Sequence, residues 1–252
     1  MVMKVDLNSD MGEGFGPWRM GDDAALLDVI TSANIACGAH AGDPDVMAKT
    51  MRLAAKNGVG IGAHPGFADL KGFGRRRLNI GAEELGNLIA YQLGAAQGMA
   101  KSVGATVRHF KLHGALSNMC SEDAALARTC YEAALRVDPD IILMVLAETA
   151  QQAVVEALGA NWAGEIFADR AYEDDATLVD RSKPGAVLHE ADVAAERILN
   201  MLREDAIIAE SGKRIPAKID TICLHGDTPE AVEMARALRE KLSAAGVTLA
   251  QF

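Results

Sequence analysis

Long apolar runs, paired cysteines and concentrated positive charge are all scarce in this sequence, and each shortage excludes a class of protein. No stretch reaches the ~18 uninterrupted apolar residues of a membrane span, and residues 1–6 lack the basic and then apolar pattern of a secretion signal. The four cysteines form no CxxC pair, which argues against a zinc ribbon or a disulfide framework. We therefore expect a cytoplasmic protein with reduced cysteines and no membrane partner.

Negative charge predominates, because 35 Asp and Glu face 25 Lys and Arg and the formal net charge is −10. Nucleic acids and anionic lipid surfaces bind through concentrated Lys and Arg, and the one basic run here is Arg75-Arg76-Arg77. No G-x-x-x-x-G-K-[ST] phosphate loop occurs, and the glycines after the first strand do not form G-x-G-x-x-G. The sequence predicts no nucleic-acid partner, and a bound nucleotide would be held by something other than a phosphate loop.

Short β-branched or aliphatic runs alternate along the chain with stretches of helical period. The runs predict strands near residues 4–7, 33–36, 59–63, 107–112, 141–146, 163–168 and 219–224. The stretches predict helices near residues 22–31, 44–57, 82–103, 122–137, 148–158, 191–205 and 229–245. Seven such units predict an α/β fold: one closed or nearly closed TIM-like barrel of about seven parallel strands over residues 1–252. A doubly wound open sheet is the alternative.

Residues 170–190 show neither the period of a helix nor that of a strand. The segment is rich in charged residues and contains Pro184 and Gly185, both of which interrupt regular structure. It therefore predicts a long loop over one face of the barrel, of the kind that often serves as a lid.

Polar side chains follow nearly every predicted strand. The loops after parallel strands converge at the carboxyl end of the sheet, so these side chains are expected around one pocket. Four of the six histidines fall there. In chain order the candidates are Asn8, Asp10, Glu13, Asn34, His40, Asp43, His64, Arg75, Lys111, His113, Asp169, Arg170, His225 and Asp227.

Each candidate also has an ordinary structural explanation. A single histidine after a strand is most often a loop residue, and Asp43 before Pro44 could simply cap a helix. Asp10 and Glu13 could belong to a solvated turn. Lys111 inside a barrel would need an anionic partner, for which Asp10 or a bound phosphate would serve.

Several long motifs occur in a recognisable order. They are residues 6–16 (DLNSDMGEGFG), 33–43 (ANIACGAHAGD), 62–65 (GAHP), 73–76 (FGRR), 111–118 (KLHGALSN), 165–172 (EIFADRAY) and 225–227 (HGD). Together they resemble the LamB/YcsF family, whose members are the A subunit of bacterial 5-oxoprolinase. Leu112 and Ser117 depart from the family pattern, which usually has proline and tyrosine there.

The resemblance implies a distorted (β/α) barrel similar to that of polysaccharide deacetylases. It also implies ATP-dependent opening of 5-oxoproline to L-glutamate, with ATP as co-substrate and the B and C subunits of 5-oxoprolinase as partners. On this reading Asp10 is the leading general base, Glu13 a base or metal ligand, and Lys111 with Arg75 or Arg170 stabilises anions. His40, His64 and His113 would handle substrate or protons, and Asn8, Asn34, Asp43, Asp169, His225 and Asp227 would bind substrate or phosphate.

Two other functions fit the same residues. Asp10, His40 and His64 could hold a divalent cation that activates water, as in a metal-dependent deacetylase or amidohydrolase. The chain could instead be a non-catalytic binding subunit of a lactam-utilising complex. Metal analysis distinguishes a metal-dependent hydrolase from ATP-dependent lactam opening. Turnover of variants at the site histidines distinguishes a non-catalytic subunit from an enzyme.

Overall fold

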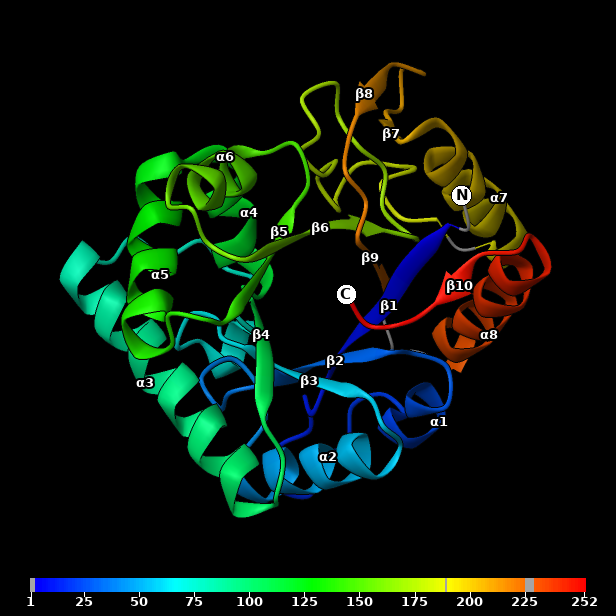
Figure 1. Cartoon of the computed structure of the whole chain (residues 1–252). Coiled ribbons are helices and arrows are strands. Elements are labelled where there is room, and N and C mark those ends of the chain that lie inside the picture. The colour runs from blue at the N-terminus through cyan, green and yellow to red at the C-terminus, as the bar shows by residue number, and fades with distance from the viewer. Residues whose placement is uncertain (1–2, 189, 225–228) are drawn as a thin grey trace.

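Seven parallel strands close into a barrel in the computed structural model, which describes residues 3–188, 190–224 and 229–252. The strands lie in the order β1-β2-β3-β4-β5-β6-β9, and β9 pairs back onto β1 (Figure 1). This closure confirms the predicted TIM-like barrel and excludes an open sheet. Their bounds are β1 Lys4–Met11, β2 Ser32–Ala36, β3 Gly60–His64, β4 Val107–Lys111, β5 Ile142–Leu146, β6 Trp162–Phe167 and β9 Thr221–Leu224.

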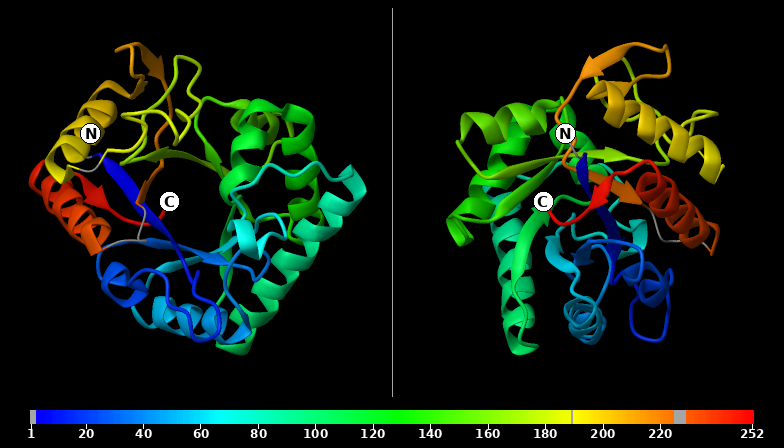
Figure 2. Two further views of the ribbon diagram at one scale, coloured as in Figure 1. Left: turned by 180° about the vertical axis from the view of Figure 1, so that it is seen from behind. Right: turned by 45° about the vertical axis from the view of Figure 1, so that its right-hand side comes forward.

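Helices surround the barrel, and seen from behind they again lie outside the ring of strands (Figure 2). They are α1 Asp23–Leu27, α2 Pro44–Lys56, α3 Ala82–Ser102, α4 Gly114–Glu122, α5 Ala124–Val137, α6 Ala150–Ala157, α7 Ala191–Glu204 and α8 Pro229–Ala244. No helix among the described residues is long and apolar enough to cross a lipid bilayer. A short 3-10 turn, η1 Leu70–Gly72, follows β3.

The structure adds elements that the sequence pattern does not predict. The expected helix at 122–137 is preceded by a separate helix, α4, because Asp123 has extended backbone and accepts hydrogen bonds from the amides that begin α5. Two three-residue strands, β7 Ala206–Ile208 and β8 Arg214–Pro216, form an antiparallel hairpin that is too short to show a period. The helix expected at 22–31 ends at Leu27.

Both faces of the barrel strands are buried, but they differ in chemistry. On β1, Val5 and Leu7 belong to the hydrophobic core that the helices cover. The alternate residues Asp6, Asn8 and Asp10 contact polar groups on other strands. Strand alternation thus separates an apolar outer layer from a polar barrel interior.

The C-terminal segment crosses the amino end of the barrel (Figure 1). Strand β10, Thr248–Leu249, pairs with the start of β1, and the Gln251 side-chain amide donates to the Gly58 carbonyl. The Phe252 ring lies 5.5 Å from the ring of His109, inside the barrel. A cavity that collects the candidate residues therefore has to lie at the carboxyl end.

The loop between β6 and α7, residues 168–188, follows the predicted irregular course. It contains only isolated bridges, such as the one between Tyr172 and Leu178. Several of its side chains line the cavity described below. The expected loop over one face is confirmed.

Candidate functional site

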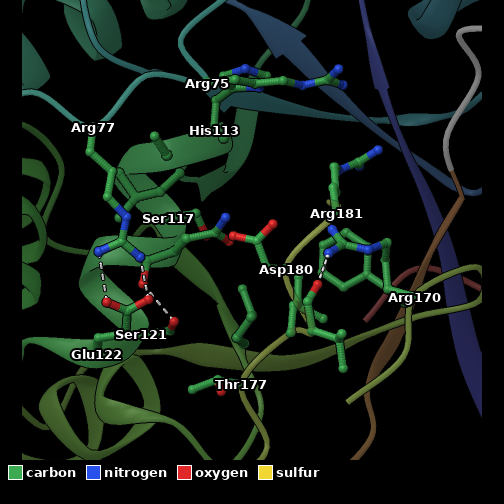
Figure 3. A pocket seen from close by; sticks show the side chains of 18 of the residues that line it. Arg75, Arg77, His113, Ser117, Ser121, Glu122, Arg170, Thr177, Asp180 and Arg181 are labelled. Atoms are coloured by element: carbon green, nitrogen blue, oxygen red, sulfur yellow. Dashed lines mark hydrogen bonds and ion pairs between the residues drawn. The ribbon is translucent and has the colours of Figure 1, made fainter. Parts of the chain in front are cut away.

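A cavity of about 520 Å³ opens at the carboxyl end of the barrel strands. Figure 3 shows Arg75 and His113 at one side of this cavity, Arg77, Ser117, Ser121 and Glu122 at a second, and Thr177, Asp180 and Arg181 of the β6–α7 loop at a third. The lining also includes Asp10, Glu13, His64, Lys111, Phe167, Arg170 and the two departures from the family pattern, Leu112 and Ser117. Among the residues that the structure describes, six Lys and Arg line this cavity although the whole chain is acidic.

Three histidines that are far apart in the sequence meet at the floor of this cavity. His40 follows β2, His64 ends β3 and His113 caps α4, and all three are buried. The rings of His40 and His113 stack with centroids 3.7 Å apart, and the His64 ring stands edge-on to both. Gly74 permits this packing, because a Cβ there would lie 2.8 Å from both histidines that stack, and its φ of +61° suits glycine.

Backbone carbonyls determine which ring nitrogens carry hydrogen. His64 Nδ1 lies 2.9 Å from the Lys111 carbonyl oxygen, and His113 Nε2 lies 2.8 Å from that of Phe73. A carbonyl only accepts, so both rings donate there. In their neutral forms the remaining nitrogens, His64 Nε2 and His113 Nδ1, then present two lone pairs to each other across 3.0 Å. Two facing lone pairs repel unless a positive species, a proton or a metal ion, lies beside both.

Burial keeps part of this cluster uncharged. It lowers the pKa of His40 well below the ordinary value, and charge on His113 and His64 would lower it further. Burial also lowers the pKa of His113 to about 3. Both rings are therefore neutral at pH 7, the form in which imidazole binds metal ions. Neither ring nitrogen of His40 has a hydrogen-bond partner among the described residues.

Glu13, His40, His64 and His113 form a group that can hold a divalent cation, because their ligand atoms all lie within 4.8 Å of one another. His113 is an addition to the expected ligands, Glu13 was expected as a base or a metal ligand, and Asp10, which the sequence also suggested as a ligand, is not in the group. The donor types suit zinc and similar ions. The carbonyls that hold His64 and His113 are the outer partners that metal-binding histidines commonly have.

Asp10 lies beside the histidines and is the centre of a charged network. Its Oδ2 is 3.3 Å from His64 Nε2, while its Oδ1 accepts from the Asn34 amide at 2.9 Å and the Lys111 ammonium at 3.0 Å. The expectation that Lys111 pairs with Asp10 is confirmed. Lys111 also lies 2.7 Å from Glu165 Oε1, which the sequence did not identify as its partner.

Opposite charges pair in this buried layer. Burial alone would lower the pKa of Lys111, but Asp10, Cys223 and Glu165 outweigh it and raise the pKa well above its ordinary value. Burial raises the pKa of Glu165, and the Lys111 ammonium opposes that rise. Two carboxyl groups, those of Asp10 and Glu165, thus contact the Lys111 ammonium.

Asn8 and Asn34 link this network to polar residues nearer the amino end of the barrel. The Asn34 amide donates to Asn8 Oδ1, and the Asn8 amide donates to the Thr221 hydroxyl, which in turn donates to Asp6. His109 Nε2 donates to Asn34 Oδ1 at 2.7 Å. The two asparagines therefore orient Asp10 and Lys111 from the side that faces away from the cavity.

Three expected binding residues have structural roles. Asp43 caps α2 by accepting from the amides of Asp45 and Val46, and its second oxygen accepts from the Gly16 amide. Arg170 is buried and donates to the carbonyls of Val179 and Ala186, so it holds the β6–α7 loop in place. Asp169 is buried, and its charge acts on Arg170 and Arg197.

The basic run at 75–77 divides among three environments. Arg76 pairs with Asp69, which caps η1, and Arg77 pairs with Glu122 at the cavity rim. The Arg75 guanidinium lies 4.9 Å from the centre of the Phe73 ring, on the histidine side of the cavity. Arg75 is therefore the arginine of the run that is best placed to meet an anionic ligand near the histidines.

His225 and Asp227, expected after the last strand, lie outside the residues that the structure describes. Glu165 contacts Lys111 and His109 contacts Asn34, but the sequence analysis assigned neither residue a role. Each is an ionisable residue within a buried strand, β6 or β4, and that pattern is the signal that could have identified them.

The model of the LamB/YcsF family matches residues 5–252. The chain belongs to the LamB/YcsF family. Among its relatives is a protein of Ruegeria pomeroyi named as the A subunit of 5-oxoprolinase, which is 65% identical over 251 residues that span 100% of this chain and 99% of that protein. A protein of the same name from Rhodopseudomonas palustris is 55% identical over 251 residues, with 99% of each chain covered.

Solved structures agree with the family assignment. The lactam utilization protein from Thermus thermophilus has a TM-score of 0.93 at 40% identity and covers 99% of this LamB/YcsF chain and 100% of its own. A peptidoglycan N-acetylglucosamine deacetylase has a TM-score of 0.50 at 11% identity, over 99% of this chain and 86% of that one. The second match shows the fold alone, and it confirms the expected likeness to polysaccharide deacetylases.

Proposed function

We propose that this chain is the A subunit of an ATP-dependent 5-oxoprolinase, in which it opens the lactam of 5-oxoproline to give L-glutamate. The observation that carries the proposal is the 65% identity, over the full chain, to a protein named as that subunit. A name that designates one lettered subunit implies a complex of several, and we propose the B and C subunits as the partners. Phosphorylation of the lactam oxygen at the expense of ATP would make the resonance-stabilised carbonyl carbon reactive toward water.

A divalent cation fits the site by two independent features of the chain. The facing lone pairs of His64 and His113, 3.0 Å apart, call for a positive species, and the ligand atoms of Glu13 and the three histidines all lie within 4.8 Å of one another. His64, His113 and Glu13 would hold the cation. His40 stacks parallel to His113, so its lone pairs lie in another plane and its ring would have to turn to bind the same ion. A bound cation would polarise the scissile carbonyl or the attacking water.

Asp10 is the proposed general base. Its Oδ1 is occupied by Asn34 and Lys111, which leaves Oδ2 directed toward His64 and the cavity. The Lys111 ammonium pairs with the Asp10 carboxylate at 3.0 Å and fixes its position. A carboxylate in this position can accept the proton of an attacking water, a contribution of ~10²–10⁴ in rate.

The anion-stabilising role moves to Arg75. Lys111 lines the cavity, but its ammonium already contacts Asp10, Glu165, Asn8 and Cys223, so we propose that it acts on Asp10 rather than on substrate. Arg75 lines the cavity beside the histidines. We propose that its guanidinium binds the substrate carboxylate or the oxyanion that forms on the carbonyl.

The test is glutamate formation from 5-oxoproline by the purified chain with the B and C subunits, with and without ATP. We expect formation only with ATP and all subunits, and a ~10²–10⁴-fold lower rate for Asp10→Asn. Asp205→Asn is the matched control, because Asp205 is exposed at the end of α7 and its left-handed backbone also suits asparagine. A near-normal rate for Asp10→Asn would overturn the assignment of the base.

A metal-dependent amide hydrolase without ATP is the second candidate, and the Glu–His₃ group is the observation that favours it. Chelator-sensitive amide hydrolysis without ATP would support this candidate and overturn the first. Cation binding is measured separately by calorimetry with zinc and manganese. Glu13→Gln and His113→Ala should weaken binding, whereas Glu122→Gln, at the rim of the same cavity, should not.

A further inference from the structure

Exposed apolar side chains are concentrated in one short segment next to the cavity. Among the described residues, the large hydrophobic side chains that are exposed are Phe15, Trp18, Met20, Leu70, Tyr91 and Val193. Half of them lie within residues 15–20. Trp18, one of the two tryptophans of the chain, is 70% exposed. An exposed tryptophan among other apolar side chains is typical of an interaction surface.

The segment is held in place. The backbone amides of Phe15 and Trp18 each donate to the carbonyl of the other at 3.0 Å, which forms a tight hairpin. The Gly16 amide donates to the Asp43 carboxylate at 2.7 Å, and this ties the hairpin to the start of α2. This hairpin, residues 15–20, therefore presents Trp18 from a fixed position, which lowers the entropy cost of binding a partner.

The hairpin is also at the mouth of the proposed active site. It begins two residues after Glu13, which lines the cavity and belongs to the cation-binding group. It follows β1 at the carboxyl end of the barrel, the end at which the cavity opens. A protein seated on Trp18 would therefore lie beside the cavity entrance and could shield the cavity from water.

Charge argues against a second copy of this chain as the occupant. A symmetric contact would bring together two chains of net charge −10 and place the exposed Arg19 of each copy near its mate. The exposed parts of Phe15, Trp18 and Met20 amount to about 300 Å² if each side chain offers roughly 200 Å². They would therefore form the centre of a larger contact with a partner, because a stable interface buries at least ~1,200 Å².

We infer that the hairpin at residues 15–20 is the docking site for another protein of the complex. The partner would offer an apolar pocket for the Trp18 indole and carboxylates beside it for Arg19. The inference rests on the proposed function, because it takes the partner to be the B or the C subunit of 5-oxoprolinase. If the partner phosphorylates the lactam oxygen, docking at this hairpin would release that phosphorylated intermediate next to Asp10 and Arg75 and limit its loss to water.

Binding of the purified chain to the purified B and C subunits tests the inference without reference to turnover. We expect Trp18→Ala to raise the Kd at least tenfold and Met20→Gln to raise it by a smaller factor. Tyr91→Ala is the matched control, because Tyr91 is a 75% exposed aromatic on the outer helix α3, and its Kd should stay within twofold of the parent. Partner binding should also shift tryptophan emission to shorter wavelength, and Trp18→Phe should remove that shift.

Three results would overturn the inference. They are an unchanged Kd for Trp18→Ala, no binding of the parent chain to either partner at ~50 μM, and a concentration-dependent homodimer that Trp18→Ala abolishes. The proposed function can fail separately. Trp18-dependent binding without any glutamate formation would leave the docking site standing and refute the oxoprolinase activity.

Discussion

Removal of the buried Lys111 ammonium should destabilise the protein severely. In Lys111→Met the apolar stem is kept and the charge is lost, so Asp10 and Glu165 become uncompensated carboxylates in the barrel interior. At 3.0 and 2.7 Å, each ion pair is worth about 6 kcal/mol of gross Coulomb attraction at an effective dielectric constant of ~20. Relief of the ammonium's own desolvation offsets much of this, and we expect a net loss of about 3–5 kcal/mol.

The loss should depend on pH in a defined direction. The pKa of Lys111 is raised in the folded protein, so its stabilisation is fully present below its unfolded value of ~10.5 and is lost only as pH rises through the folded pKa. The pKa of Glu165 is also raised, and it should rise further without Lys111. A raised carboxyl pKa favours the folded state at low pH, so Lys111→Met should be less destabilised at pH 5 than at pH 8.

Urea denaturation at both pH values measures these effects. Lys101→Met, at an exposed position on α3, is the control and should change the free energy of unfolding by no more than about 0.5 kcal/mol. The double variant Lys111→Met/Glu165→Gln should recover about half of the loss, because one of the two unpaired charges is gone. A single variant within about 1 kcal/mol of the parent, or a double variant less stable than the single, would refute the reasoning.

Three further changes test other parts of the structure. Gly62→Ala would place a Cβ 2.0 Å from His109 Nε2 and should lower the free energy of unfolding by about 1–3 kcal/mol. Gly98→Ala is the control, because a Cβ there would meet nothing within 4 Å, and it should raise the free energy of unfolding by up to about 1 kcal/mol. Equal effects of the two variants in urea titrations would contradict this. Arg170→Met should speed proteolytic cleavage within residues 171–188, because two carbonyls of the loop lose their hydrogen-bond donor. Unchanged cleavage sites and rates on a peptide map would show that other contacts hold the loop in place. Burial raises the pKa of the Cys37 thiol to about 12, so Cys37 should resist a thiol reagent at pH 8 until urea unfolds the chain; rapid labelling of the folded protein at Cys37 would exclude this environment.

Lys111 shows how far a single residue can be understood from the sequence. Its position in a predicted strand, with the same parity as His109, required an anionic partner inside the barrel, and Asp10 is that partner. Glu165 could not be chosen as the second partner, because the pairing depends on which strands face each other across a closed barrel. That arrangement arises from the sheet order and its register, which no local pattern encodes.

Asp43 and Arg170 show where residue type alone leaves two roles open. A carboxylate before a proline suits both a helix cap and a ligand, and an arginine beside a loop suits both an anion and backbone carbonyls. The structure shows the cap and the carbonyl contacts, because the amides of α2 and the oxygens of the β6–α7 loop lie within hydrogen-bond distance, and Arg170 also lines the cavity. Glu13 is the converse case, since only the fold brings it to the three histidines.

Local sequence was enough to establish the alternation of strands and helices, and therefore the barrel and the end at which polar residues gather. Alternation and period act over a few residues, so they can be recognised in one chain. Long-range packing alone established that two histidines face each other with their lone pairs, that Asp10 and Glu165 both pair with the Lys111 ammonium, and that Trp18 stands exposed at the cavity mouth. These relations join residues up to 155 positions apart, from Asp10 to Glu165, and barrel closure brings them within a few ångströms.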